Sequence, residues 1–431
     1  MNALYRNDRP GRHAPSVYAA GVSAPERPPL TGEISVDVAV IGAGITGLWA
    51  ALTLAKAGRS VVVLDAHRVG FGASGRNGGQ VHSGFNMGQR ALEDRLGKDR
   101  AHALWDLAEA GKDQLRAFCE TAPETHYRPG VAHGEYSALS LAEARLEADH
   151  MARHYGIETT VMGRDAFAQL VKAPAYVGGT LDESGGHLQP LAYALALARA
   201  AEAAGAVIHE RTEVLSVAEG TRVRLTTPRG RINAGHVIAA GNGYLPNLLP
   251  QVNRRVMPIN SFIAATEPLP ERWQEVMARD IAVSDSKFVV NYYRFDHERR
   301  FLFGGRESYS IGFPRDIKTA LVARMAQLFP QLSGVKVDYV WGGSLGITPS
   351  RLPHVARVGS KVLSGAGFSG HGVALSGMAG RVMAEAVLGQ EGGLATFDAL
   401  KIPAFPGGTA LRAPILTLAM SWFALRDRIG L

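Results

Sequence analysis

A strand–turn–helix–strand pattern near the N-terminus limits what this chain can fold into. An apolar strand, a glycine-rich turn, a helix and a second apolar strand ending in an acid follow one another at residues 36–41, 42–47, 46–57 and 61–65. Gly42 allows the tight turn, Gly44 lets a pyrophosphate approach the backbone, and Gly47 lets the helix pack on the strand. The phosphates would lie at the helix N-terminus, where free N–H groups favour negative charge.

Asp65 completes this pattern, because it follows Gly47 by eighteen residues, close to the spacing of a ribose-binding acid. The pattern therefore predicts a dinucleotide site; the alternative is a glycine-rich turn in another α/β protein. The residues expected to contact the dinucleotide here are Gly42, Gly44, Ile45, Thr46, Gly47, Asp65 and Ala66.

Composition excludes several other classes of protein. The net charge is +7, but the basic residues are dispersed without a run of five, so we expect no nucleic-acid partner. Cys119 is the only cysteine, which excludes internal disulfides, cysteine-rich zinc sites and iron–sulfur clusters. The fourteen histidines are scattered without metal-ligand spacing, so we expect no metal.

No targeting or membrane-spanning segment is expected. Arg6, Arg9 and Arg12 precede no apolar stretch of the kind found in secretory signals. No segment offers the roughly 18 uninterrupted apolar residues of a transmembrane helix, so we expect a cytoplasmic protein.

The remaining patterns divide the chain into further elements. Helical patterns cover residues 91–121, 140–154, 188–204 and 373–388, the second opening on a capping-box pattern at Ser140. Short strands are expected at residues 206–209, 214–217, 236–240 and 361–364, with a hairpin from 223–227 and 231–234. From Met257 to Tyr339, alternating β-branched and aromatic residues indicate an antiparallel sheet. Residues 413–427 are apolar on one face and predict a packed amphipathic helix; a membrane-surface or partner-docking helix is the alternative.

Elements of the dinucleotide-binding kind thus fall at both ends of the chain and in its middle. The expected fold class is α/β plus α+β, with a discontinuous Rossmann-like domain and an inserted antiparallel-sheet substrate domain. The expected boundaries are an N-terminal arm at 1–34, a dinucleotide-binding domain at 35–95, 165–250 and 338–395, a substrate domain at 96–164 and 251–337, and a helical tail at 396–431.

A second glycine-rich block, residues 70–80, distinguishes between dinucleotides. Its small residues let backbone lie against a large planar ligand, while Ser74, Asn77 and Gln80 offer hydrogen bonds. Arg76 can offset phosphate charge or contact substrate. The block resembles the GASGRNGG signature of the FAD-dependent amine and amino-acid oxidases, which include D-amino-acid, glycine and sarcosine oxidases. The amino-acid sequence of this block is most similar to that of the γ-glutamylputrescine oxidase branch.

The resemblance continues in order through residues 212–214, 236–243, 341–354 and 365–373. It implies an FAD-binding domain and further FAD contacts at Ser74, Arg76, Asn77, Gly78, Gly79, Gln80, Val214, Gly241, Gly367, Ser369, Gly370, His371, Gly372 and Val373. The last block also opens a long helix, whose N-terminus would favour the negative charge of a reduced flavin. For His371, a hydrogen bond within the turn is an equal alternative.

Two departures from the family pattern bear on the cofactor. Some members attach flavin through a late cysteine or an early histidine, whereas this chain has no late cysteine and carries Arg76 at the early position. We therefore expect non-covalent FAD. Residues 300–305 also lack the lysine that some sarcosine-oxidase relatives place near the flavin, so no oxygen-activating cation is assigned.

The chemistry implied by the resemblance is oxidation of a substrate C–N bond. A hydride equivalent passes from the amine to flavin N5, the imine hydrolyses, and O2 is reduced to hydrogen peroxide. Such a reaction mainly requires the protein to orient the substrate against the flavin, because the cofactor itself accepts the electrons. We therefore name no catalytic acid or base. The expected partners are a small-molecule amine and O2.

Substrate contacts are expected from the inserted sheet. Tyr293 and Arg294 would form an aromatic wall and a carboxylate clamp, although packing of the sheet, with Arg294 paired to Asp296, is the stronger alternative. Trp341 would wall the cavity or pack in the core. His82 follows the glycine turn and would face the flavin.

Two rival functions remain at this point. One is a flavin dehydrogenase of the same fold that passes electrons to a quinone or carrier. The other is an NAD-dependent dehydrogenase that uses only the first motif.

Overall fold

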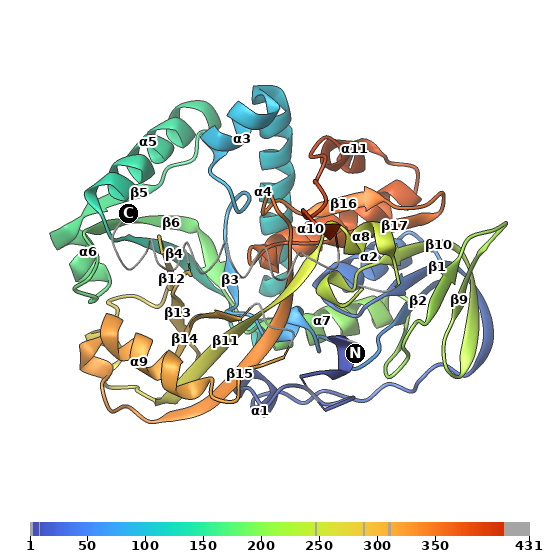
Figure 1. The fold of residues 1–431 in the computed structure, drawn as a ribbon, viewed down its shortest axis with the longest axis horizontal. Helices are drawn as coiled ribbons and strands as arrows, with labels where there is room; N and C mark the ends of the chain where they lie inside the picture. Colours follow the sequence, from blue (N-terminus) through green and yellow to red (C-terminus); the bar gives the residue numbers. More distant parts are fainter. Residues whose placement is uncertain (1–2, 8, 246–247, 288, 309–311, 409–431) are drawn as a thin grey trace.

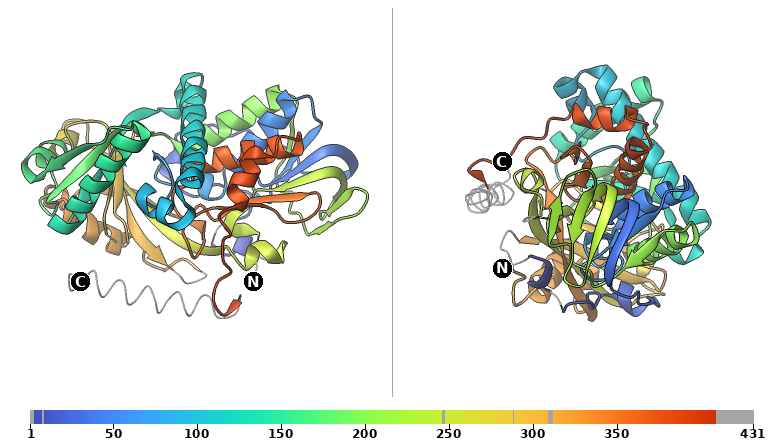
Figure 2. Two further views of the ribbon diagram at one scale, coloured as in Figure 1. Left: turned by 90° about the horizontal axis from the view of Figure 1, so that it is seen from above. Right: turned by 90° about the vertical axis from the view of Figure 1, so that its right-hand side faces the viewer.

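The computed structural model describes residues 3–7, 9–245, 248–287, 289–308 and 312–408. Its strands form one sheet of eight strands and one of nine, which lie on the right and left of Figure 1. The turned views in Figure 2 show helices packed beside both sheets. None of the helices in these ranges combines the length and apolar character needed to cross a membrane.

The first sheet is built on the strand–turn–helix–strand pattern. In spatial order its main strands are β16 (His354–Arg357), β17 (Val362–Ala366), β10 (Gly230–Ala239), β1 (Gly32–Ile41), β2 (Val61–Leu64) and β7 (Val207–His209). All neighbours are parallel except β16 and β17. Every residue of β2 is buried, as is typical of a strand covered on both faces.

Helices α2 (Ile45–Lys56), α7 (Pro190–Ala203) and α10 (Gly372–Val387) pack against this sheet, and α4 (Lys98–Glu120) packs on α10. Glycine lets α10 approach α2 closely, because a Cβ on Gly380 would lie 2.1 Å from the Thr46 carbonyl oxygen. The predicted role of Gly47 is confirmed in the same way: a Cβ there would lie 1.9 Å from the carbonyl oxygen of Gly42.

The second sheet is antiparallel apart from one pair. Its strands in spatial order are β15 (Val337–Ile347), β11 (Met257–Pro268), β14 (Arg300–Ser308), β13 (Tyr292–Phe295), β12 (Ala282–Asp285), β4 (Arg128–Glu135), β6 (Gly178–His187) and β3 (Gln80–Val81), with β5 (Thr160–Gly163) also on β6. Only β12 and β4 run parallel. Phe295, Phe301, Phe303 and Phe329 fill its core.

Three strands lie in a different sheet from the one that the expected boundaries imply. β3 falls within 35–95, β6 within 165–250 and all but the first residue of β15 within 338–395, yet all three pair in the second sheet. β6 is rich in glycine and its place depends on pairing with β4, which no local pattern reveals. The remaining domain boundaries stay predictions.

Among the described residues, local elements differ from expectation in three places. The predicted helix at 91–121 is two helices, α3 (Gln89–Leu96) and α4, separated at Gly97, whose φ is +84°. The cap of α5 (Ala138–Tyr155) is Ser137, and Ser140 is the third helical residue. The strand expected at 214–217 begins at β8 (Ser216–Ala218), while the hairpin of β9 (Val223–Thr226) and β10 is confirmed. The helix predicted at 413–427 lies outside the described residues.

The N-terminal arm is ordered along the first sheet. It contains a 3₁₀ turn at Ala3–Tyr5 and the short helix α1 (Val17–Ala20). Among the described residues, no group of three His, Cys, Asp or Glu side chains is placed to hold a metal ion.

Candidate active site

A cavity of about 1130 Å³, called the central cavity below, lies between the two sheets. Its walls include the carboxyl ends of β1 and β2 and the first turns of α2 and α10. Residues of β4, β6, β11 and β13 form the opposite side. Small-molecule pockets typically measure roughly 300–1,000 Å³, so this volume suits a large cofactor together with a small substrate.

The turn from β1 to α2 forms one end of the central cavity. Gly42 has φ of +106°, and a Cβ there would lie 2.9 Å from the Ala240 carbonyl oxygen, so only glycine fits. Gly44 is the N-cap residue of α2 and lines the cavity together with Gly42. Glycine backbone and a helix N-terminus together suit a pyrophosphate.

Asp65 lies directly after β2 and faces the same end of the cavity. Its two carboxylate oxygens accept the backbone N–H groups of Ala43 and His67, each at 2.8 Å. Burial raises the pKa of Asp65 to about 6, against the lowering effect of those two hydrogen bonds. The position fits the predicted ribose-binding role.

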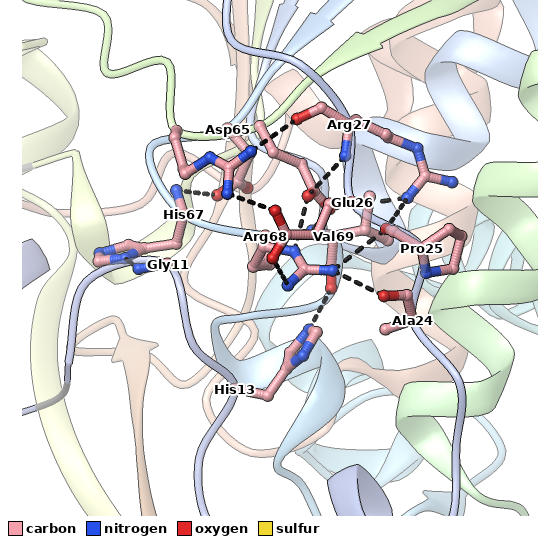
Figure 3. Close-up of polar contacts among 12 residues, drawn as sticks. Gly11, His13, Ala24, Pro25, Glu26, Arg27, Asp65, His67, Arg68 and Val69 are labelled. Carbon is pink, nitrogen blue, oxygen red and sulfur yellow. Dashed lines mark hydrogen bonds and ion pairs between the residues drawn. The ribbon is translucent and has the colours of Figure 1, made fainter.

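The N-terminal arm reaches this end of the cavity, and Figure 3 shows its polar contacts with the residues that follow β2. Leu4 lines the cavity, and its carbonyl oxygen lies 2.8 Å from His67 Nε2. The hydroxyl of Tyr5 donates to Glu213 at 2.6 Å, and the backbone N–H of Gly11 donates to His67 Nδ1 at 3.1 Å. The arm therefore covers the residues that would hold the adenosine half of a dinucleotide.

A buried carboxylate ties the arm to the loop after β2. Glu210 is 1% exposed and pairs with Arg68 (Nε–Oε2, 2.6 Å) and with Arg27 of the arm (Nη1–Oε1, 3.6 Å). Its oxygens also accept the backbone N–H groups of Val69 at 3.0 Å and Arg27 at 3.2 Å. Arg27, Arg68 and Val69 appear together in Figure 3.

The second glycine-rich block forms one wall of the cavity. The Ser74 hydroxyl oxygen accepts the Ile45 N–H at 3.0 Å and so joins this block to the start of α2. The Arg76 guanidinium donates to the carbonyl oxygens of Phe71 at 2.6 Å and Gly342 at 3.2 Å. Arg76 therefore anchors the block to β15 through its side chain.

Asn77 and Gln80 also fold their side chains back onto the protein. Asn77 Nδ2 donates to the Ala73 carbonyl oxygen at 2.9 Å, and its Oδ1 accepts the Gly79 N–H at 2.7 Å. Gln80 Nε2 donates to the Val283 carbonyl oxygen at 2.9 Å. Both residues line the cavity, but these amide groups serve first to hold its wall.

Two histidines lie at the other end of the central cavity, beside the N-terminus of α10. The rings of His82 and His371 are 5.1 Å apart, and His371 Nε2 lies 3.2 Å from the Ser83 carbonyl oxygen. Burial lowers the pKa of His82 to about 3 and that of His371 to about 4, so both are neutral near pH 7. Ser369 precedes the helix with φ of +52°.

Three of the four predicted substrate residues do not line the cavity. Tyr293 is 1% exposed and packs among the phenylalanines of the second sheet. Arg294 donates to the Gly78 carbonyl oxygen at 2.6 Å and the Tyr18 hydroxyl at 3.1 Å. Trp341 is buried, and its Nε1 donates to the Arg76 carbonyl oxygen at 2.9 Å. These positions argue against the predicted clamp, and only His82 remains at the cavity.

Most predicted cofactor residues do line the cavity. They are Gly42, Gly44, Ile45, Thr46, Asp65, Ala66, Ser74, Arg76, Asn77, Gly78, Gln80, Val214, Gly241, Ser369, Gly370, His371, Gly372 and Val373. Gly47, Gly79 and Gly367 lie behind the wall; a Cβ on Gly79 would lie 2.1 Å from the Leu188 carbonyl oxygen. Direct contact of each residue with a cofactor stays a prediction.

A hydroxyl–carboxylate pair on the cavity wall, Ser83 and Asp182, was not predicted from the sequence. Ser83 Oγ donates to Asp182 at 2.7 Å, and both residues line the cavity. Asp182 lies in the middle of β6, opposite Val131 of β4. No motif surrounds it, so only the pairing of strands brings it to the site.

The chain matches the model of a family described as FAD dependent oxidoreductase over residues 37–386. It is 40% identical to the "Probable oxidoreductase OrdL" of Rhizobium meliloti over 94% of this chain and 96% of that protein. It is 35% identical to the gamma-glutamylputrescine oxidoreductase of Escherichia coli over 97% of this chain and 99% of that protein.

Solved structures of low identity share the fold. An L-proline dehydrogenase from P. horikoshii has a TM-score of 0.72 at 19% identity, covering 87% of this chain and 97% of that one. Glycine oxidase from Geobacillus kaustophilus has a TM-score of 0.70 at 20% identity, covering 84% and 98%. The expected fold class, a Rossmann-like FAD-binding domain with a substrate domain, is confirmed, and the family match favours FAD over NAD.

Proposed function

Because the chain belongs to the family of FAD-dependent oxidoreductases, we propose that it oxidises the C–N bond of an amine such as γ-glutamylputrescine. The observation that carries this proposal is the continuity of the central cavity. The cavity joins the Asp65 end, which suits a dinucleotide, to the N-terminus of α10 beside His82. The identity to a gamma-glutamylputrescine oxidoreductase supports the choice of amine.

The protein's own residues hold and orient the reactants. Gly42, Gly44 and the N-terminus of α2 would bind the pyrophosphate, and Asp65 would accept hydrogen bonds from the ribose. The N-terminus of α10 would favour negative charge at the flavin pyrimidine ring. His82 and His371 bring no positive charge to this end, because burial keeps both neutral.

FAD, when bound, would supply the two-electron acceptor for a hydride equivalent from the carbon next to the substrate nitrogen. The imine product hydrolyses to a carbonyl compound and an amine or ammonia, and we propose that O2 is reduced to hydrogen peroxide. The walls of the cavity contribute by fixing the distance between the reacting atoms.

An amine panel with the purified holoprotein tests this function. The panel contains γ-glutamylputrescine, putrescine, glycine, sarcosine and D-alanine, and the readouts are anaerobic bleaching of the flavin and aerobic peroxide. We expect γ-glutamylputrescine or putrescine to bleach the flavin, with one peroxide formed per amine oxidised. Bleaching without peroxide, together with reduction of a quinone, would assign the protein as a dehydrogenase. No bleaching by any amine would overturn the proposal.

We also propose that FAD is held without a covalent bond. Cys119, the only cysteine, lies on α4 and does not line the cavity. Denaturation and ultrafiltration would then release all of the flavin into the filtrate. Flavin that stays with the polypeptide would contradict this part of the proposal.

A further inference from the structure

A buried lysine lies directly behind the cavity wall that carries Asp182. Lys112 of α4 is 1% exposed. Its ammonium group donates to Ser83 Oγ at 2.6 Å and Ser184 Oγ at 2.7 Å, and it pairs with Glu109 Oε2 at 2.5 Å. The three N–H donors of Lys112 thus have three partners within the protein.

The two serines connect this lysine to Asp182. Ser83 Oγ donates to one carboxylate oxygen at 2.7 Å, while the Ser184 hydroxyl and backbone N–H donate to the other at 2.6 and 2.8 Å. Each hydroxyl has one hydrogen, which it gives to Asp182, and so it receives one from Lys112. The hydrogen-bond directions are therefore compatible with an ionised Asp182.

The charge of this cluster does not cancel. The ammonium of Lys112 is neutralised by Glu109, so the carboxylate of Asp182 leaves one net negative charge at the cavity wall. Burial acts to raise the pKa of Asp182, but the hydrogen bonds from Ser184 and Ser83 and the charge of Lys112 together hold it below its usual value.

This negative charge lies close to the end of the cavity that would hold the flavin ring. Ser83, whose hydroxyl donates to Asp182, also has its carbonyl oxygen 3.2 Å from Nε2 of His371. His371 is the residue directly before α10. Among the described residues that line the cavity, the basic side chains besides histidine are Arg76 and Arg351. Arg76 already donates to two carbonyl oxygens, and the clamp predicted at Arg294 is not at the cavity.

We propose that Asp182 binds the amino group of the substrate, and that the substrate is a cationic alkyl amine without a carboxylate on the reacting carbon. The inference rests on the proposed function and extends it by naming a specificity residue. A carboxylate accepts hydrogen bonds from the ammonium and from the neutral amine, so Asp182 can hold the nitrogen in both states. An α-carboxylate would be repelled at the same place.

The first test compares the Asp182→Asn and Glu183→Gln variants of the holoenzyme. Glu183 is the next residue along β6, lies at the surface and pairs with Arg279, so it is a matched control. A hydrogen bond to a charged group is worth about 1.5–3 kcal/mol, so we expect KM for the best amine to rise roughly 10- to 100-fold in Asp182→Asn and to stay unchanged in Glu183→Gln. An unchanged KM in Asp182→Asn, with the flavin content retained, would overturn the inference.

The second test uses the wild-type protein, and so decides the question if Asp182→Asn does not fold. The holoenzyme is titrated with n-butylammonium and with butyrate, which match in chain length, and the flavin absorbance is followed. We expect saturable binding of butylammonium and at least 10-fold weaker binding of butyrate. Equal or tighter binding of butyrate, or faster oxidation of glycine or D-alanine than of putrescine, would overturn the inference.

The two proposals fail in different ways. If no amine reduces the flavin, the proposed function is wrong. If amines are oxidised but the Asp182→Asn and butyrate tests give the contrary results, only the role of Asp182 is wrong.

Discussion

Asp65 illustrates how burial sets the protonation of single residues in the central cavity. Its pKa is raised to about 6, whereas a ribose hydroxyl donates its hydrogen bond to the ionised form. FAD binding should therefore release a proton at acidic pH.

We expect the dissociation constant of FAD to rise about tenfold per pH unit below about pH 6 and to level off above it. The direction follows from the raised pKa, because apoprotein that has gained a proton on Asp65 must lose it to bind. Titration of apoprotein by flavin fluorescence across pH 5–8 measures the slope. The Asp65→Asn variant should bind more weakly and without this slope, and a slope that persists would exclude Asp65 as its source.

Lys112 differs from Asp65, because its buried ammonium group has a partner for each of its three hydrogens. Replacing it by methionine would leave Glu109, which is 18% exposed at its side chain, without its partner. We expect Lys112→Met to lower the free energy of unfolding by about 3 kcal/mol, the lower end of the range for a broken buried pair. Lys98→Met, at an exposed position of the same helix, should change it by less than about 0.5 kcal/mol. Denaturant unfolding measures both, and equal effects would contradict the argument.

At the scale of elements, the N-terminal arm is placed to cover the proposed cofactor site. It contributes Leu4 to the cavity and Tyr5 to the hydrogen bond with Glu213, whereas the Glu210 ion pairs attach it further along the chain at Arg27. Residues 1–12 also contact His67 through Leu4 and Gly11. These contacts are separate from the Arg27 ion pair, so residues 1–12 can be removed while that ion pair stays.

Deletion of residues 1–12 should weaken FAD binding about tenfold. It removes the hydrogen bond from the Tyr5 hydroxyl to the Glu213 carboxylate and the apolar side chain of Leu4 at the cavity. Tyr5→Phe should weaken it less, since only the hydrogen bond is lost. Equilibrium dialysis with FAD measures both variants. Unchanged affinity in the deletion variant would show that the arm does not cover the bound cofactor.

At the scale of the whole molecule, the central cavity receives walls from both sheets, so a ligand there joins the two halves. A ligand that binds only the folded state stabilises it by about 2.7 kcal/mol at one hundred times its dissociation constant. We expect the Tm to rise with FAD concentration, with both halves unfolding together in the holoprotein. Calorimetry of the apoprotein and holoprotein measures this, and a Tm independent of FAD would contradict binding of FAD to the folded protein.

Residues close in the chain were the most predictable part of this structure. The β1–α2 turn, Asp65 and the start of α10 each depend on contacts within a short segment, so their residue types report their roles directly. For Tyr293 and Arg294 the sequence left a cavity role and the stronger alternative, packing of the sheet, side by side. Period-two alternation does not tell which face of a sheet meets a cavity and which meets a core, and the structure places both residues away from the cavity.

The sequence by itself determined the dinucleotide fold, because glycine turns, helix starts and a terminal acid act locally, and the resemblance of residues 70–80 to a family signature indicated FAD. Tertiary structure alone decided which charges lie at the central cavity. Asp182, Ser83 and Lys112 come from β6, the segment after β3, and α4, and they converge only when β6 pairs in the second sheet and α4 packs behind it. The physical reason is that a charge acts over a few ångströms in space, whatever the separation along the chain.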